Sequence, residues 1–261
     1  MKTGVSTACF YPLETEKALV RVGEIGVKTA EIFFNAPSEL ESPLIDRICE
    51  IKDKYSINIK SIHPYLSFGE TYLFFCEYKR RYYDTLKIFR KHFEVAKKLN
   101  SKFLVIHGSL LPGIISKEEY FERFKNLVEL GKEYDVVVAQ ENVVKFFSES
   151  PDFLLSMQDA LKDDFHMVLD LKQAARANRS AFEFVDRLGE SIVHIHVSDL
   201  NDKFDCLPPG EGVFDFNRLI SKVKNMNGDV DLIIELYKKS FETDSQIIKS
   251  VDYLNSIISK H

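Results

Sequence analysis

The sequence predicts an α/β fold, a single (β/α)8 TIM barrel that spans residues 1–261 as one domain. Three observations predict it. Short apolar runs alternate with longer amphipathic stretches along the whole chain, eight such runs are found, and no low-complexity or Gly/Ser-rich linker divides them. The length of 261 residues also matches the ~250 residues typical of such a barrel.

The eight expected strands are the runs rich in Val, Ile, Leu and Phe. Most are almost continuously apolar, as in parallel strands that are covered on both faces. They are Lys2–Thr7, Thr29–Phe34, Asn58–His63, Phe103–His107, Val136–Glu141, His166–Asp170, Ile192–Val197 and Leu232–Glu235. A doubly wound open sheet shows the same alternation, but no Gly-rich phosphate loop follows the first run, which favours the barrel.

Capping patterns mark several helices between these strands. The spacing of a capping box occurs in three pairs: Ser38 with Glu41, Ser116 with Glu119, and Thr243 with Gln246. Ser150 before Pro151 fits an N-cap followed by a first-turn proline. Three glycines stand where helices are expected to stop: Gly26, Gly131 and Gly189. Gly131 is also consistent with a position inside the last turn of its helix.

Composition argues against several classes of protein. The net charge of −5 gives no broad positive field for nucleic acid or an anionic membrane. The 4 cysteines are widely separated and form no C-x-x-C pair, which is typical of free thiols in a reducing compartment. Neither a signal-peptide core nor a run of about 18 apolar residues occurs. We expect a cytoplasmic protein with no membrane or nucleic-acid partner.

Polar residues that end apolar runs are the candidates for chemistry, because barrel active sites lie at the C-terminal ends of the strands. Five of the last six runs end with such a residue, namely His63, His107, Glu141, Asp170 and Glu235, and His196 is the last residue but one of the seventh run. Neighbouring strands lie ~4.8 Å apart, so side chains from the last four runs can converge on one point. Three buried carboxylates repel one another unless a cation neutralises them.

We therefore expect Glu141, Asp170, His196 and Glu235 to bind a divalent metal ion. Carboxylate and imidazole donors favour Mn²⁺, Mg²⁺ or Co²⁺ and are compatible with Zn²⁺. A single acid at a strand end is more often a helix cap or an ion-pair partner than a ligand. The hypothesis therefore depends on the four residues together.

The remaining histidines have less specific roles. His194 shares a strand face with His196 but lies deeper, so we expect it to bond to a neighbour inside the barrel. His63 and His107 could bind a second ion, and we favour hydrogen bonds to the substrate.

Two further features are open to a plain structural interpretation. The lysines that follow the last strands could meet a phosphate, but we expect them at the solvated surface; they are Lys145, Lys172, Lys238 and Lys239. The Pro- and Gly-rich segment 207–212 is equally consistent with a functional loop and with an ordinary turn.

Several motifs together resemble the xylose isomerase-like barrel superfamily over essentially the whole chain. They are Gln140-Glu141-Asn142, Val168-Leu169-Asp170, His194-Ile195-His196-Val197-Ser198-Asp199, Pro209-Gly210-Glu211-Gly212 and Ile233-Ile234-Glu235. That superfamily includes sugar (phosphate) isomerases, ketose 3-epimerases, inosose dehydratases and metal-dependent apurinic endonucleases. The resemblance implies the same four metal ligands, with Glu141 and Glu235 also as the proton-transfer pair of the epimerases.

The chain departs from the superfamily pattern at three places. Gln173 stands where relatives with a further zinc or an epimerase pocket have histidine, and we expect it to bind substrate instead. No aspartate–histidine pair follows His196, since the next histidine is His261. Asp202 replaces an epimerase arginine. A three-zinc DNA-repair site is therefore disfavoured, and the particular epimerase substrate stays open.

The hypothesis for function is a metal-dependent isomerase or epimerase of a small sugar, polyol or sugar phosphate, an enzyme of carbohydrate metabolism. Glu141 and Glu235 would remove and return a proton next to a carbonyl. The alternative is a dehydratase of an inosose-like or keto-acid-like substrate. An apurinic endonuclease and a non-catalytic sugar-binding barrel are weaker alternatives, and the helix surfaces leave the oligomeric state, including a homo-oligomer, open.

Overall fold

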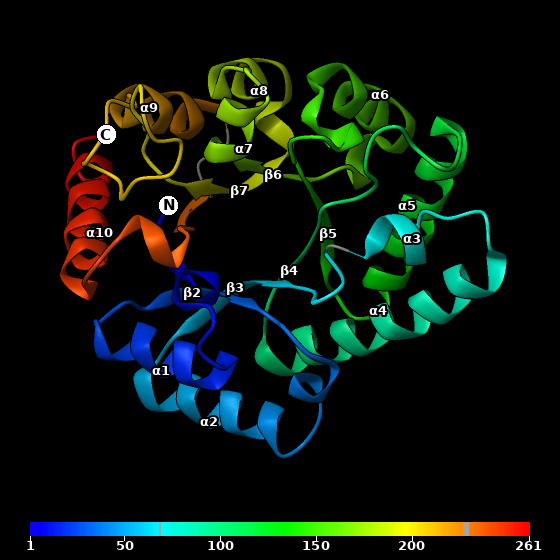
Figure 1. The fold of residues 1–261 in the computed structure, drawn as a ribbon, viewed down its shortest axis with the longest axis horizontal. Coiled ribbons are helices and arrows are strands. Elements are labelled where there is room, and N and C mark those ends of the chain that lie inside the picture. Colours follow the sequence, from blue (N-terminus) through cyan, green and yellow to red (C-terminus); the bar gives the residue numbers. More distant parts are fainter. Residues whose placement is uncertain (68, 227–229) are drawn as a thin grey trace.

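The chain folds into a closed barrel of parallel strands inside a ring of helices (Figure 1). The computed structural model describes residues 1–67, 69–226 and 230–261. The strands pair in sequence order, and the last one closes the ring against the first. They are β1 (Thr3–Ser6), β2 (Thr29–Phe33), β3 (Asn58–His63), β4 (Phe103–Ile106), β5 (Val137–Glu141), β6 (Met167–Asp170), β7 (Ile192–Val197) and β8 (Asp231–Ile234). The predicted barrel is confirmed.

The strand boundaries differ from the predicted ones by one residue at most, and β3 and β7 are identical to them. Two of these differences touch the site. His107 follows β4, and Glu235 follows β8, so both begin the loops on the C-terminal rim rather than end the strands. Both residues therefore lie at the C-terminal rim, as predicted, but one residue beyond the end of the strand.

Helices cover the outer face of the barrel on all sides (Figure 1). No helix of the described residues is long and apolar enough to cross a membrane. The α-helices are α1 (Thr15–Glu24), α2 (Leu44–Tyr55), α3 (Glu70–Leu73), α4 (Lys79–Leu99), α5 (Lys117–Lys132), α6 (Pro151–Leu161), α7 (Leu171–Arg176), α8 (Ala181–Leu188), α9 (Phe216–Met226) and α10 (Asp244–Ile258).

Most of the predicted helix starts are confirmed. The hydroxyls of Ser116 and Ser150 accept hydrogen bonds from the third residue of α5 and α6, and Gln246 Oε1 accepts from Thr243 N at the start of α10. The prediction at Ser38 was wrong. Ser38 lies inside a short 3₁₀ turn (Pro37–Leu40) whose entry is capped by the Glu39 carboxylate, and α2 begins only at Leu44.

The predicted helix stops hold at two of the three glycines. Gly26 follows α1 with a positive φ of 83°, and Gly189 is the C-cap of α8. Gly131 lies within the last turn of α5, the alternative position that the sequence left open. A Cβ at Gly131 would stand 2.6 Å from the carbonyl oxygen of Val136, so this glycine serves close packing.

The apolar core lies between the strands and the helices, whereas the barrel interior is largely polar. Val105, Ala139 and Val168 form a small apolar cluster of their own inside the barrel. Side chains alternate along a strand, so the inward positions two residues further toward the rim carry polar groups. Buried polar residues of the strands include Glu31, Ser61, His63, Glu141, Asp170, His194 and His196. A barrel with so many buried polar groups needs a specific network to satisfy them.

Candidate metal centre

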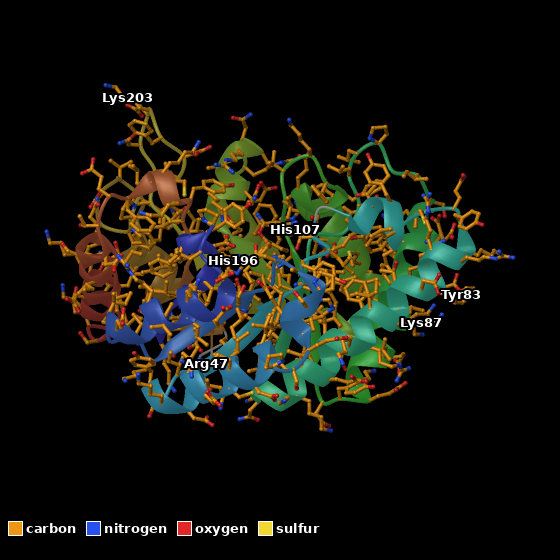
Figure 2. The ribbon with its side chains drawn as sticks, turned by 60° about the horizontal axis from the view of Figure 1, so that its bottom comes forward. Arg47, Tyr83, Lys87, His107, His196 and Lys203 are labelled. Carbon is orange, nitrogen blue, oxygen red and sulfur yellow. The ribbon has the colours of Figure 1, made fainter. Side chains whose placement is uncertain are left out.

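Four side chains from neighbouring strands meet at the C-terminal end of the barrel. Glu141, Asp170, His196 and Glu235 each offer one ligand atom, and these atoms all lie within 4.8 Å of one another. His196 Nδ1 lies 3.7 Å from Glu141 Oε1, 3.7 Å from Asp170 Oδ2 and 3.5 Å from Glu235 Oε2. Figure 2 shows His196 in the middle of the molecule. The four predicted residues are thus brought together around one point.

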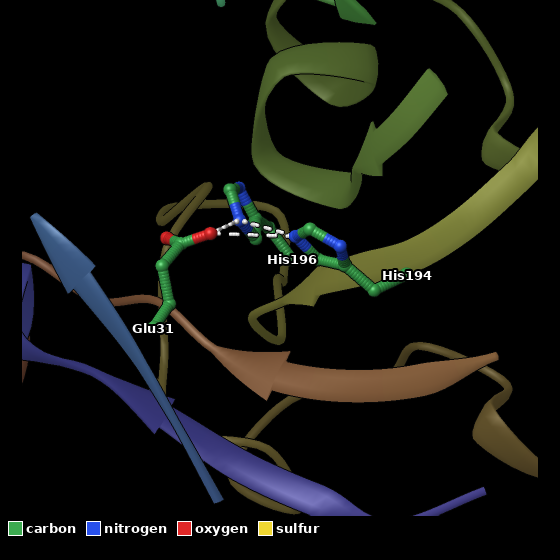
Figure 3. A group of neighbouring side chains, drawn as sticks. All are labelled: Glu31, His194 and His196. Carbon is green, nitrogen blue, oxygen red and sulfur yellow. Dashed lines mark hydrogen bonds and ion pairs between the residues drawn. The ribbon is translucent and has the colours of Figure 1, made fainter. Parts of the chain in front are cut away.

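The imidazole of His196 is oriented from behind by Glu31 of β2 (Figure 3). His196 Nε2 lies 3.0 Å from Glu31 Oε2. Burial opposes the charged form of His196, but Glu31 and Glu235 outweigh it and raise the pKa of His196 well above its usual value. When a metal ion is bound, Nδ1 would lose its proton and offer its lone pair to the ion, while Nε2–H donates to Glu31. Nδ1 is buried and has no hydrogen-bond partner among the described residues. A carboxylate behind a histidine is the usual support of a metal-binding imidazole.

Glu31 was not predicted, because it lies inside a strand rather than at its end. It is fully buried and accepts hydrogen bonds from Ser6 Oγ at 3.2 Å and Ser61 Oγ at 2.7 Å. A register shift between β2 and β3 sets Ser61 directly opposite Glu31. Burial opposes ionisation, but His196 and His194 outweigh it and hold the pKa of Glu31 well below its usual value. The only sequence signal was an acid within an apolar run.

His194 has the interior position that was predicted. Its side chain is buried, and Nε2 lies 3.3 Å from both Glu31 Oε2 and His196 Nε2 (Figure 3). Burial is the main cause that lowers the pKa of His194, so this ring stays neutral beside its charged neighbours.

Glu141 is positioned by two histidines on the side away from His196. Its Oε2 lies 3.2 Å from His63 Nε2 and 3.3 Å from His107 Nε2, and Ser67 Oγ lies 2.8 Å from His63 Nδ1. Burial raises the pKa of Glu141, but the surrounding histidines, His107 foremost, lower it well below its usual value. The carboxylate is therefore ionised. His63, His107 and Glu141 form a further group that could hold a metal.

Asp170 combines a structural contact with an open oxygen. It is the N-cap of α7, where Oδ1 accepts from Gln173 N at 2.9 Å. Asn142 fixes its backbone, accepting from Asp170 N at 2.6 Å and donating to Asp170 O at 3.0 Å. Only Oδ2 is left to face His196. Burial raises the pKa of Asp170, and the nearby charge of Lys172 does not offset this effect.

The prediction that Lys172 lies at the solvated surface was wrong. Its side chain is only 4% exposed, and its ammonium contacts Asp170 Oδ2 and Glu235 Oε2. The cause is local. Asp170 ends β6 and caps α7, so a residue two positions later in the first turn lies back over the barrel mouth. The other three lysines of that group, Lys145, Lys238 and Lys239, are exposed as predicted.

The residues fit a divalent ion. Three carboxylates and one imidazole nitrogen form an oxygen-rich donor set of the kind that Mn²⁺, Mg²⁺ and related ions accept. The buried Nδ1 of His196, which has no hydrogen-bond partner among the described residues and faces three carboxylates, indicates that a cation belongs at this point.

A pocket of about 610 Å³ opens above the cluster. Of the four cluster residues, only Glu141 and Glu235 line it, together with the predicted substrate contacts His107 and Gln173. His63 is not part of the lining, since it lies behind Glu141. The remaining lining is mainly aromatic and apolar: Ala8, Tyr11, Phe33, Phe34, Asn35, Tyr65, Val143, Phe146, Lys172, Leu236 and Tyr237.

Glu70 is a second buried acid that the sequence did not reveal. It opens α3, beyond the end of β3, and it is fully buried. Its Oε2 accepts from Gly108 N at 2.5 Å, while Oε1 has no partner among the described residues. Burial raises the pKa of Glu70 to about 7. No capping or strand pattern distinguishes this position in the sequence.

The segment 207–212 is held by Asp199 rather than by the cluster. Asp199 Oδ2 accepts from the amides of Gly210 and Gly212 at 2.9 and 3.0 Å, and Oδ1 accepts from Phe214 N at 2.9 Å. A Cβ at Gly212 would stand 2.4 Å from Asp199 Oδ1. Close approach of the backbone thus explains this glycine.

Fold and site together define a (β/α)8 barrel with a buried acid and histidine cluster suited to a divalent metal ion. Comparison with known proteins agrees with this class. The chain belongs to the xylose isomerase-like TIM barrel family, whose model matches residues 19–257.

Relatives in sequence and structure cover nearly the whole chain. An uncharacterized protein of Methanocaldococcus jannaschii, MJ1311, is 26% identical over 90% of this chain and 83% of its own length. A D-tagatose 3-epimerase-like protein superposes with a TM-score of 0.81 and 22% identity, over 100% of this chain and 98% of that one. The IolI protein, solved with a zinc atom, gives a TM-score of 0.76 and 20% identity, over 100% and 99%. At these identities the solved structures establish a shared fold.

Proposed function

We propose that the protein is a divalent-metal-dependent isomerase or epimerase of a small sugar or polyol. One observation carries the proposal: Glu141 and Glu235 belong to the cluster that would hold the metal and also line the 610 Å³ pocket. Proton transfer requires two groups that reach the substrate. Glu141 and Glu235 meet this requirement because they line the pocket, whereas Asp170 and His196 are not part of its lining.

The chemistry divides between the ion and the chain. When bound, a divalent ion would polarise a substrate carbonyl and acidify the neighbouring C–H. One of Glu141 and Glu235 then removes the proton, and the other returns it at the opposite face or the next carbon. Burial opposes the ionisation of both glutamates. The surrounding histidines nevertheless lower the pKa of Glu141, and the charge of Lys172 lowers the pKa of Glu235. Both can therefore accept a proton.

The other predicted contacts have supporting roles in this proposal. His107 and Gln173 line the pocket and would hydrogen-bond the substrate oxygens. Gln173 Oε1 already accepts from Val144 N at 3.3 Å, so its amide nitrogen is the group that would donate to the substrate. His63 would act through Glu141, to which it is bonded.

The pocket lining supports an unphosphorylated substrate. Lys172 is the one lysine or arginine among the described residues that line it, and both Asp170 and Glu235 engage that ammonium. A phosphate there would meet at most this single ammonium, among carboxylates and aromatic rings and without an arginine in the described lining. The aromatic rings instead suit the C–H faces of a sugar or polyol.

The test is a screen of ketoses, inososes and sugar phosphates in heavy water with Mn²⁺. We expect deuterium uptake into an unphosphorylated ketose or inosose without change of its carbon skeleton. Glu235→Gln should abolish turnover, with the circular dichroism spectrum unchanged, while the exposed control Glu242→Gln should retain wild-type rates. Retained deuterium exchange in Glu235→Gln would contradict the assigned role.

A dehydratase would begin with the same proton removal and then expel a hydroxyl group. Product mass separates the two reactions, because isomerisation conserves the mass and dehydration lowers it by one water. Nicking of abasic DNA would instead support the endonuclease alternative. Against this alternative, the chain has Gln173 where the related endonucleases have a histidine.

A further inference from the structure

Lys172 holds the position that a cation would take in the cluster. Its ammonium contacts Asp170 Oδ2 and Glu235 Oε2, the same two oxygens that face His196 Nδ1 at 3.7 and 3.5 Å. With 4% of its side chain exposed, Lys172 is almost withdrawn from water. Lysine is rarely buried to this extent unless it is paired with acids.

The charge balance explains why the lysine is retained there. His63 and His107 contact Glu141, and His194 and His196 contact Glu31, at 3.0 to 3.3 Å. Asp170 and Glu235 instead share the more distant Nδ1 of His196, at 3.7 and 3.5 Å. Lys172 contacts both carboxylates and is nearly fully buried. A buried lysine between two acids is an ammonium that neutralises the pair.

We propose that Lys172 is the resident cation of the site, and that a divalent ion binds only by displacing its ammonium from Asp170 and Glu235 into the adjoining pocket. Two cations at the same oxygens would stand about 4 Å apart or less and repel strongly where water is excluded. Asp170 is held by its cap and by Asn142, whereas the lysine stem is flexible. Lys172 is thus the group that moves.

The displacement links the metal to the substrate. Lys172 already lines the 610 Å³ pocket, so its released ammonium would face the substrate oxygens above the cluster. A neutral sugar could then accept a hydrogen bond from Lys172. Without the ion, this ammonium is bound to Asp170 and Glu235 and is not available to the sugar. This inference depends on the proposed metal site but not on the proposed reaction.

Manganese affinity tests the displacement. Lys172→Met keeps the stem length and removes the charge, so it should bind Mn²⁺ at least about ten-fold more tightly than wild type, because no ammonium has to leave. The matched control Lys239→Met removes an exposed rim lysine and should stay within about two-fold of wild type. Free Mn²⁺ is measured by electron paramagnetic resonance. An equal or weaker affinity in Lys172→Met would overturn the inference.

A second measurement uses the wild-type protein and needs no variant to fold. Lys172 should be acetylated at least about ten-fold faster with saturating Mn²⁺ than with EDTA, as followed by mass spectrometry, because displacement frees the amine. Bound Mn²⁺ with an unchanged rate would overturn the displacement.

The outcomes for the inference and for the proposed function are distinguishable. Tighter Mn²⁺ binding in Lys172→Met without turnover of any polyol by the wild type would sustain the inference and remove the function. Turnover by the wild type, together with equal Mn²⁺ affinities of wild type and Lys172→Met, would sustain the proposed function and remove the inference. If neither wild type nor Lys172→Met binds Mn²⁺, the inference falls together with the metal site.

Discussion

His196 Nε2 lies 3.0 Å from Glu31 Oε2, and this contact turns the opposite ring nitrogen toward the three carboxylates of the cluster. Glu31 comes from β2 and His196 from β7, so the orientation depends on closure of the barrel. Two serine hydroxyls hold Glu31 in turn. The donor atom at the centre is therefore positioned by residues that never touch the pocket.

Replacing Glu31 by Gln should weaken Mn²⁺ binding by about 10- to 100-fold, because the neutral amide no longer supports the basicity of the His196 ring. Equilibrium dialysis against Mn²⁺ measures the change. Glu24→Gln, which neutralises an exposed acid of α1, should leave the affinity unaltered. Wild-type affinity in Glu31→Gln would show that Glu31 is only a packing residue.

His92 of α4 should make the protein sensitive to acid. Burial lowers its pKa from 6.5 to about 4. Between these pH values the His92 ring is protonated in the unfolded chain and neutral in the folded chain. The associated stability is complete above pH 6.5 and is lost as the pH falls toward 4. His92→Phe should therefore reduce the loss of unfolding free energy between pH 7 and pH 5 by about 2 kcal/mol.

Urea unfolding at the two pH values measures this effect. Phe89→Leu disturbs a ring that packs against His92 but removes no titrating group, so it should lower the stability equally at both pH values. A pH dependence in His92→Phe that matches wild type would exclude His92 as the source.

Asp199→Asn should destabilise the loop after β7. An amide can accept at only one of the two oxygen positions, yet both carboxylate oxygens of Asp199 receive backbone N–H groups, including those of Gly210 and Phe214. We expect a loss of roughly 2–3 kcal/mol and faster hydrogen exchange at the amides of residues 210–214. Exchange that spreads through the whole barrel instead would mean that Asp199 supports the global fold.

Much of the fold and the central cluster could be predicted from the sequence. The strands are parallel and buried on both faces, so they appear as apolar runs, and the acids and histidine that end them are visible as exceptions. Asp170, Glu141, His196 and Glu235 were found for this reason, and the barrel closure brings them together.

The roles of the other residues could not be predicted, because they depend on tertiary contacts that local sequence patterns do not show. Glu31 lies within a strand and acquires its role only when β2 and β7 face each other across the barrel. Lys172 follows a strand-end acid, as exposed lysines also do, and its burial depends on the direction of α7. Ser38 has the spacing of a cap, but the chain uses Glu39 instead. Each of these depends on tertiary context.

The most direct test of the central claim is the Mn²⁺ content of the purified protein after saturation and removal of excess ion. We predict about one Mn²⁺ per chain for wild type and almost none for Asp170→Asn. The substitution replaces one of the three carboxylate ligands by a neutral amide. The same folded circular dichroism spectrum is expected for both proteins. Wild-type protein that takes up no Mn²⁺, or an Asp170→Asn variant that binds it equally well, would contradict the account.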